Sequence, residues 1–581
     1  MIILRMLLFL CIFLGGGLYV KRHFKVELLW APVIYLCGVN VLLFVFGLLN
    51  MLNIGVIIIS VASLLYGMRE LIFNPSLLVK LNRKEIWLFI AVLSGLAWFF
   101  NGAILLGYDD FSHWGLMVRE MLVYGRLPNF ENTIIGFTSY PPGTALHIYF
   151  VSYLVGQTEG IMLWAQSVYT VSMAVVLLTI VPKRDKLLIG AMSLFILFLM
   201  TSVHRLTSLS VDPLLSLLSI AAIIIAYQSV QKRHISNNKI LGVIFTALVL
   251  IKHSGVFFYG TSALLVLYLQ RRYLSKQQDR LYLFMPLLSV FLWRRHISFA
   301  FGAGSSSKHA VNLASYRNIA SSKSVTEIIT IVRAMLHKMT DVYFYDNKVL
   351  LVLVSVFFLM LIIKKWHKIS IRRDIYFFGV SVAVYGVYQL LLLSMYIFSM
   401  PMYEAQNVAS YSRYNMTMIA ILIGLLAIYL IETIKKWPKI KELKGVFIVS
   451  SILLTMLSRS KIIDHININE DVYTHRMDLI DIKEAGNILW DEASIVLLVD
   501  KEELKISEDL LKYIAKYEFR TADITTVSED EWNSVDISQY EGSYLASVPY
   551  RDSTEVDVSF QSEYLIPLEN QIYRIEKENE Y

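Results

Sequence analysis

Long apolar runs separated by short basic clusters dominate the first 460 residues of the chain. A run of about 20 apolar residues is long enough to cross the hydrocarbon core of a bilayer. Lys252 and His253 interrupt one long apolar stretch, which we nevertheless divide into a hairpin of two spans. The pattern then predicts fourteen spans, at residues 2–20, 27–48, 51–67, 86–107, 161–181, 187–202, 212–229, 239–253, 254–270, 281–294, 348–364, 375–399, 413–432 and 445–459.

The polar residues 461–581 have a different pattern. They contain SIVLLVD, which predicts a buried strand, and EDLLKYIAKYEF, which predicts an amphipathic helix. The predicted fold class is therefore an all-α polytopic membrane protein with a small C-terminal α/β domain.

Composition agrees with this prediction. Hydrophobic residues make up 56% of the chain and charged residues only 17%, whereas a soluble globular protein is about one quarter charged. A soluble enzyme, a disordered chain and a fibrous repeat are thereby excluded. The two cysteines, Cys11 and Cys37, both lie in apolar runs, which excludes a disulfide framework or a cysteine-rich metal site.

Charge predicts the orientation of the spans, because cytoplasmic loops carry an excess of Lys and Arg. The basic clusters fall on one side when the spans alternate, so both chain ends are expected outside. The first span, which has its basic cluster after it, is expected to be a retained anchor. The tail carries 28 acidic and 11 basic residues, a net charge of −17 that favours a soluble domain. The clusters are Lys21–Lys25, Lys80–Lys84, Lys183–Lys186, Lys232–Arg233, Arg271–Arg272, Lys364–Lys365, Arg372–Arg373 and Lys435–Lys444.

Three regions follow from this topology. Residues 1–85 form extra N-terminal spans, and residues 86–460 form a transmembrane core with outer loops at 108–160 and 295–347. Residues 461–581 form the extracytoplasmic domain. In the first outer loop, residues 111–124 and 144–156 are apolar at helical spacing but too short to span, so we expect two helices in the membrane interface.

The motif YDDFSHW, Tyr108 to Trp114, directly follows the fourth predicted span. Ionisable residues at a membrane boundary are costly and are commonly functional. Asp109 or Asp110 could serve as a general base at the membrane surface. Alternatively, Asp110 could cap a helix that begins at Phe111. His113 could share a metal with either aspartate, although a structural role at the interface is the simpler interpretation.

Two further candidates lie inside apolar runs. Asp212 precedes Pro213 at the start of the seventh span, which is a common pattern for a helix cap. Lys252, beside His253, needs an anionic partner or a route to the interface. A lipid phosphate would be a natural partner, and simple snorkelling is the alternative.

Several charged residues fall on the predicted outer side. Arg294 and Arg295 follow the tenth span there, against the positive-inside trend, and suggest an anion. Glu404 and Arg413 flank the start of the thirteenth span. Arginine can hold a phosphate through two hydrogen bonds, and a Glu404–Arg413 ion pair is the equally weighted alternative.

The order of these features resembles the GT-C superfamily of integral-membrane glycosyltransferases, which includes the protein O-mannosyltransferases and the lipid A aminoarabinose transferases. The matching features are the span 86–107, the acidic pair Asp109-Asp110 and the two interfacial segments, over roughly residues 86–460. The stretches SVDPLL, LIKHSGVFF and ASYSRYNM resemble family positions near the donor phosphate and sugar. Three spans precede this core.

The resemblance implies an inverting transfer of a sugar from a polyprenyl-phosphate donor to a cell-envelope polysaccharide, teichoic acid or glycolipid. Asp109 or Asp110 would be the base, and Lys252 and Arg413 would hold the phosphate. Substrate contacts would come from His113, Asp212, His253, Arg294, Arg295, Glu404 and Tyr414. No cofactor is required with certainty, and a divalent cation stays an open alternative. The expected location is a bacterial plasma membrane, and no nucleic-acid partner is expected.

Two other functions compete with this transferase. A flippase or transporter for lipid-linked sugars can also have fourteen spans, but it should show a polar midplane cavity and paired halves. An envelope scaffold would leave the outer carboxylates without a role.

Overall fold

The computed structural model describes the chain except for residues 1, 75–83, 131–132, 204, 232–237, 272–277, 303–312, 465–466, 486–487, 489, 491–492, 533, 549–564, 568–571 and 577–581. The described chain is mainly helical and divides into two compact units. The helical unit comprises Met1–Ala103, Ser139–Leu206 and Ser210–His465. The sheet unit comprises Ile104–Thr138, Thr207–Leu209 and Ile466–Tyr581.

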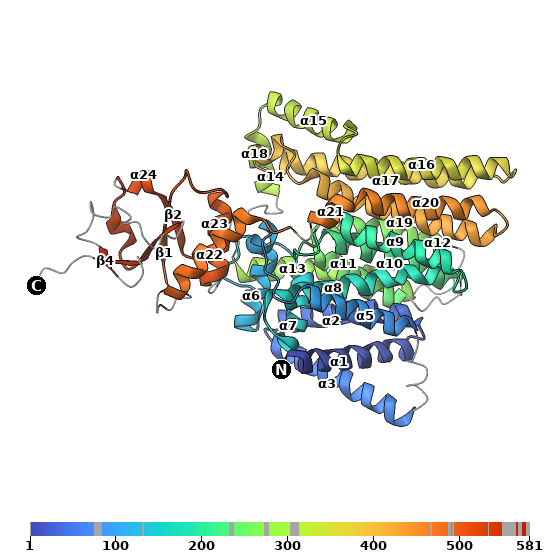
Figure 1. Ribbon diagram of the computed structural model, residues 1–581, viewed down its shortest axis with the longest axis horizontal. Coiled ribbons are helices and arrows are strands. Elements are labelled where there is room, and N and C mark those ends of the chain that lie inside the picture. Colours follow the sequence, from blue (N-terminus) through green and yellow to red (C-terminus); the bar gives the residue numbers. More distant parts are fainter. Residues whose placement is uncertain are drawn as a thin grey trace, which may run out of the picture. The chain divides into compact units, whose positions relative to one another are not determined.

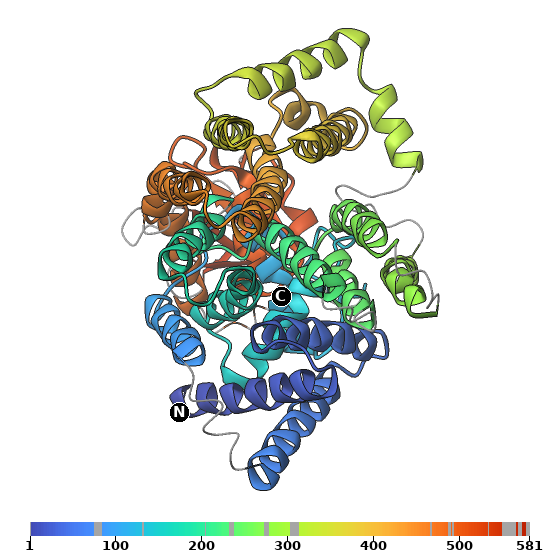
Figure 2. The same cartoon turned by 90° about the vertical axis from the view of Figure 1, so that its right-hand side faces the viewer.

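Long helices lying side by side build the helical unit (Figures 1 and 2). They are α1 (Ile2–His23), α2 (Ala31–Leu48), α3 (Leu52–Phe73), α5 (Lys84–Phe99), α8 (Glu159–Ala174), α9 (Lys186–Ser202), α10 (Asp212–Gln231), α11 (Asn238–Ile251), α12 (Gly255–Gln270), α13 (Met285–Ala300), α16 (Tyr345–Trp366), α17 (Arg372–Phe398), α19 (Tyr411–Lys436) and α20 (Lys441–Leu457). Short 3-10 turns extend three of them, at Leu28–Trp30, Val175–Ile180 and Gln278–Phe284.

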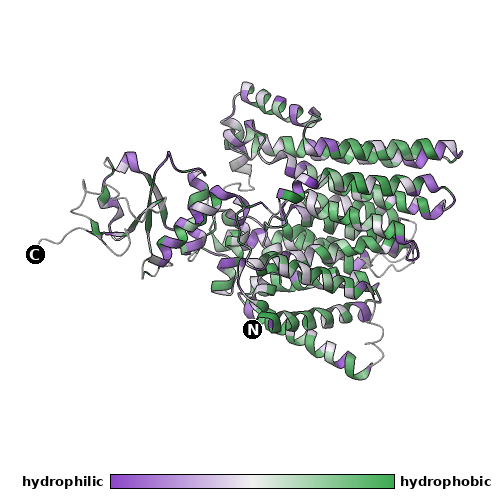
Figure 3. Ribbon diagram, viewed as in Figure 1, coloured by the Kyte–Doolittle hydropathy of each residue, from purple (hydrophilic) through white to green (hydrophobic). Residues whose placement is uncertain are grey.

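Within the described residues, eight helical segments are long and apolar enough to cross a membrane. In Figure 3 the long helices are hydrophobic along most of their length, and hydrophilic residues gather at their ends. The chain is therefore a multi-pass membrane protein. A helix lies in each of the fourteen predicted ranges, but α5 ends at Phe99, eight residues before the predicted end at 107, and the number of actual crossings stays a prediction. Parts of three basic clusters, at 80–83, 232–233 and 272, lie outside the described residues.

Helix α10 forms the centre of this unit. Its residues are apolar around most of the circumference, and 89% of the residues in its most apolar segment are buried. This is expected for a helix that other helices surround. Helix α19 packs closely against it at Gly424, where a Cβ atom would lie 2.5 Å from Ile220. By contrast, only 22% and 17% of the residues in the most apolar segments of α16 and α17 are buried. These two helices therefore present apolar surface outward.

Shorter helices complete the helical unit. They are α7 (Gly143–Val155), α14 (Leu313–Ser321), α15 (Val325–Thr340), α18 (Met402–Gln406) and α21 (Arg459–Asp464). Helix α7 confirms the helix expected at 144–156, and its side chains are mostly buried. Lys323, just before α15, donates to the carbonyls of Tyr396, Ile397 and Met400, so it closes the C-terminal end of α17.

The sheet unit contains a five-stranded sheet with strand order β2-β1-β3-β5-β4. Strand β1 (Ile495–Val499) pairs in parallel with β2 (Ile524–Ser528) and β3 (Tyr544–Val548), whereas β5 (Tyr573–Ile575) pairs antiparallel with β3 and with β4 (Leu565–Pro567). All five residues of β1 are buried, which confirms the strand predicted from SIVLLVD. Helix α23 (Glu508–Phe519) confirms the predicted helix, and a serine side chain, Ser507, caps it.

Helices α22 (Glu470–Ala485) and α24 (Glu529–Trp532) and the 3-10 turn Ile537–Tyr540 also belong to the sheet unit. So does the segment with the YDDFSHW motif, which forms a π-helical turn at Asp110–Trp114 followed by α6 (Gly115–Tyr124). The helix expected at 111–124 is thus confirmed, with a widened first turn. The predicted all-α fold with a small C-terminal α/β domain is confirmed.

Candidate functional site

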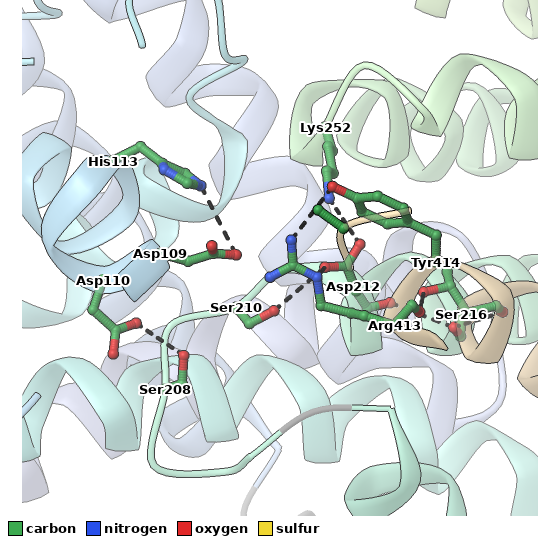
Figure 4. Close-up of polar contacts among 12 residues, drawn as sticks. Asp109, Asp110, His113, Ser208, Ser210, Asp212, Ser216, Lys252, Arg413 and Tyr414 are labelled. Atoms are coloured by element: carbon green, nitrogen blue, oxygen red, sulfur yellow. Dashed lines mark hydrogen bonds and ion pairs between the residues drawn. The ribbon is translucent and has the colours of Figure 1, made fainter. Parts of the chain in front are cut away.

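The helical unit contains a charge cluster around Asp212, the first residue of α10 (Figure 4). Lys252 Nζ donates to Asp212 Oδ1 at 2.9 Å, and Arg413 Nε lies 3.3 Å from Asp212 Oδ2. The Asp212 side chain is 2% exposed, whereas those of Lys252 and Arg413 are 12% and 17% exposed. Two cations therefore share one buried carboxylate, which leaves a net charge of about +1 for an anion to neutralise.

Asp212 lies at the first residue of α10, followed by Pro213. Proline is favoured directly after a helix start because its fixed φ suits the helix. It lacks an N–H, but an N–H at this position would have no partner within the helix. Ser210 Oγ lies 3.4 Å from Asp212 Oδ2, and Ser216 Oγ donates to the Thr417 carbonyl on α19. Asp212 was expected to be mainly a helix cap. The structure instead gives its carboxylate two ion pairs.

Lys252 occupies the break between α11 and α12, which confirms that the long apolar stretch is divided there. Its anionic partner in the structure is Asp212, whereas the sequence suggested a lipid phosphate. Its Nζ also lies 4.8 Å from the centre of the Tyr414 ring, a distance suited to a cation–π contact. The lysine is thus held on two sides and is not simply snorkelling.

Arg413 and Tyr414 belong to the first turn of α19, directly after an unusual turn. Val408 and Ser410 adopt left-handed φ values of 46° and 58°, and Val408 is completely buried. A β-branched residue rarely adopts this conformation, and such strain is concentrated at functional sites. The turn directs the start of α19 toward Asp212, so the ion pair of Arg413 is with Asp212. The alternative Glu404–Arg413 pair stays a prediction.

The other substrate candidates have different surroundings. His253 packs its ring 5.8 Å from that of Tyr140, and its buried Nε2 has no hydrogen-bond partner among the described residues. Glu404, on α18, accepts a hydrogen bond from Tyr403 at 2.9 Å. Arg294 and Arg295 are exposed on α13. His253 is adjacent to the charge cluster, as the chain neighbour of Lys252.

A second buried carboxylate, Asp346, was not singled out by the sequence. It accepts a hydrogen bond of 2.6 Å from Asn415, whose own carbonyl oxygen accepts from Tyr385 and Gln389. These hydrogen bonds connect α16, α17 and α19. Their common member, Asn415, lies two positions after Arg413. The available signals were the position of Asp346 on the predicted outer side and a polar Asn inside an apolar span.

In the sheet unit, Asp110 is fully buried and accepts three hydrogen bonds. The donors are the Gly107 N–H at 3.0 Å, the Leu209 N–H at 2.7 Å and the Ser208 hydroxyl at 2.9 Å, the last of which is drawn in Figure 4. Burial raises the pKa of the Asp110 carboxyl to about 7, although the three donors act in the opposite direction. The carboxylate accepts from the preceding Gly107, so it does not cap a helix beginning at Phe111.

Asp109 has a different environment. Its side chain is 14% exposed, and its carboxylate lies 4.0 Å from Nε2 of His113. The other ring nitrogen of His113 hydrogen-bonds the Ser112 hydroxyl at 2.7 Å, and its ring packs against Trp114 and Phe137. The histidine is therefore oriented on both sides, with one nitrogen directed to Asp109.

Sequence reasoning missed the partners of Asp110. Ser208 and Ser210 alternate in the stretch SLSVD before Asp212, and small polar residues next to a predicted buried acid were the available signal. No group of three metal-binding side chains lies together within the described part of the chain.

Comparisons with known proteins give little further information. No protein family matches the chain, and no curated protein matches it. Among solved structures, the chain is similar to ArnT from Cupriavidus metallidurans bound to undecaprenyl phosphate, with 10% identity and a TM-score of 0.40 over 84% of this chain and 97% of that chain. At this low similarity, the comparison contributes nothing to the assignment of roles to individual residues.

Proposed function

We propose that the chain is a membrane glycosyltransferase that transfers a sugar from a polyprenyl-phosphate donor to a cell-envelope glycan or glycolipid. The observation that supports this most directly is the sharing of Asp212 by Lys252 and Arg413. Guanidinium and ammonium groups are the side chains that bind phosphate in proteins. Asp212 holds both cations in place before the ligand arrives, and such preorganised charge is what stabilises a leaving phosphate.

Asp109 is the proposed base, and Asp110 supports the loop. A general base must reach the acceptor hydroxyl, and the Asp109 side chain is partly exposed whereas that of Asp110 is fully buried among three donors. Asp109 would take the proton while the hydroxyl oxygen forms a bond to the anomeric carbon. The bond from that carbon to the phosphate oxygen breaks, and polyprenyl phosphate leaves.

An apolar groove supports a lipid-linked donor. It has a volume of about 170 Å³ and is lined by side chains of α16, α17 and α19, among them Leu353, Phe378 and Leu422. Ser381 and Tyr385 also line it. A hydrocarbon chain fits such a surface, because burial of apolar area is its main source of affinity.

The membrane orientation is part of the same proposal. The candidate base and the C-terminal domain would face outward in a bacterial plasma membrane. His253 and Tyr414 would contact the phosphate or the sugar. Arg294 and Arg295 are weaker candidates for holding the phosphate, and Glu404 is a further candidate for a substrate contact.

The test is to supply the purified chain in lipid nanodiscs with polyprenyl-phosphate sugars and an envelope glycan. Release of free polyprenyl phosphate, detected by mass spectrometry, is the expected result. Lys252→Ala serves as the inactive reference. Movement of intact donor across a vesicle membrane without such release would instead indicate a flippase.

A further inference from the structure

We infer that the C-terminal domain positions the candidate base, through a clasp formed by Arg476 on α22 and Glu518, Tyr513 and Tyr517 on α23. This inference rests on the proposed function, because it concerns the loop that carries Asp109 and Asp110. All the contacts involved lie inside the sheet unit.

Arg476 contacts the loop on both sides of the aspartate pair. Its Nη1 donates to the Leu105 carbonyl at 2.8 Å, four residues before Asp109. Its guanidinium carbon also lies 5.3 Å from the centre of the Phe111 ring, directly after Asp110. The Arg476 side chain is 5% exposed, so these contacts are shielded from water.

Glu518 fixes the orientation of that guanidinium. It accepts from Arg476 Nε at 2.8 Å and lies 2.7 Å from Nη2. With two guanidinium nitrogens held by Glu518, Nη1 is directed to Leu105. Planar arginine is suited to this arrangement, since its donors have fixed relative directions. Arg119 on α6 also lies 4.0 Å from Glu518, so the same carboxylate connects a second part of the loop segment.

Two tyrosines of α23 repeat this pattern. Tyr513 and Tyr517 are four residues apart and so share one face of the helix. The Tyr513 ring lies 5.8 Å from Tyr108, and the Tyr517 ring lies 5.3 Å from Phe111, both edge to face. One face of α23 therefore contacts the residue before the aspartate pair and the residue after it.

Together these contacts restrain both flanks of Asp109-Asp110. A displacement of about 1 Å in a catalytic group can lower a rate by about 100-fold. Arg476 and Glu518 are accordingly positioning residues, which act through the loop and do not touch the substrate.

The experiment uses the full chain in nanodiscs and compares Arg476→Met, Arg476→Lys and the milder Tyr513→Leu with the wild type. Arg574→Met is the matched control, because Arg574 is an exposed arginine of the same domain. One readout is amide hydrogen exchange of residues 105–111. The others are kcat and the KM for the polyprenyl-phosphate donor.

We expect faster exchange at 105–111 and a kcat lowered by about 100-fold in Arg476→Met, with an unchanged donor KM. Arg476→Lys should recover part of both losses, and Arg574→Met should change neither. Unchanged exchange in Arg476→Met and Tyr513→Leu would overturn the inference, as would faster exchange at an unchanged kcat. Absence of transfer by the wild type would refute the proposed function instead, and the exchange measurement would still test the clasp.

Discussion

Asp212 and Lys252 are 40 residues apart in the chain, and their side chains meet at 2.9 Å at the N-terminal end of α10. This contact brings a lysine from a helix break onto the acid that starts α10. Because Arg413 contacts the same carboxylate, removal of either partner changes the charge of the whole cluster.

Replacement of Lys252 by alanine should lower sugar transfer by at least about 100-fold, because the departing phosphate loses one of its two cations. Asp212 keeps Arg413 as a partner, so insertion and folding should persist. Lys239→Ala is the matched control, since Lys239 is an exposed lysine on the neighbouring helix α11. Initial rates of polyprenyl phosphate release measure the effect, and an unchanged rate in Lys252→Ala would contradict the phosphate assignment.

The two adjacent aspartates should respond differently to replacement by asparagine. Asp109→Asn should abolish most transfer with little change in thermal stability, because Asp109 is partly exposed. Asp110→Asn should destabilise the sheet unit by about 1–3 kcal/mol, since an amide NH₂ would face donors that now contact a carboxylate. Thermal unfolding and transfer rates, measured on both variants, distinguish the roles. Full activity in Asp109→Asn would exclude it as the base.

Stability of the sheet unit should fall as pH rises from about 4 to about 7. Burial raises the pKa of Glu120 from 4.5 to about 7 and that of Asp110 from 3.8 to about 7. The folded state therefore holds more protons than the unfolded state in this range. The stabilisation from these two groups is complete below their ordinary pKa values of 3.8 and 4.5. It is lost as the pH rises through about 7.

Glu120→Gln tests this pH dependence, because glutamine can still accept from Thr133 and Ile134 but does not titrate. Hydrogen exchange of residues 115–135 should depend less on pH in this variant than in the wild type. Glu502→Gln, at an exposed position of the same unit, should leave the pH dependence unchanged. If hydrogen exchange of residues 115–135 depends on pH equally in Glu120→Gln and in the wild type, Glu120 does not contribute to the pH dependence.

A bulky side chain in the apolar groove should discriminate between donors by chain length. Leu353 lines the groove, so Leu353→Trp should raise the KM for a long-chain donor. The indole ring would displace about two methylene groups of the donor tail from the groove. This loss of burial costs about 1.6 kcal/mol, which is roughly tenfold in affinity. The KM for a short-chain donor should not change. Leu351→Trp, at an exposed position of α16, is the control. Equal effects on both donors would show that the groove does not hold the tail.

Much of the fold could be predicted because spans and tail elements leave strong local patterns. The apolar runs predicted the long helices, and SIVLLVD predicted β1. The partners within the charge cluster were not predictable, because contacts between Asp212, Lys252 and Arg413 depend on how distant helices pack. The two left-handed positions of the turn before α19 are Val408 and Ser410, and neither residue type predicts that conformation. Likewise, nothing local to YDDFSHW indicates that Arg476 contacts its flanks.

The hydrogen bond from Arg476 to the Leu105 carbonyl joins residues 371 positions apart. At about 5–20 residues per second, the ribosome needs roughly 20–70 s to synthesise that interval. During this time the nascent loop lacks the helices that later enclose it. Premature termination anywhere before α23 would thus yield an inserted but unfinished protein, and the cell would gain the mature loop only when the last domain has emerged.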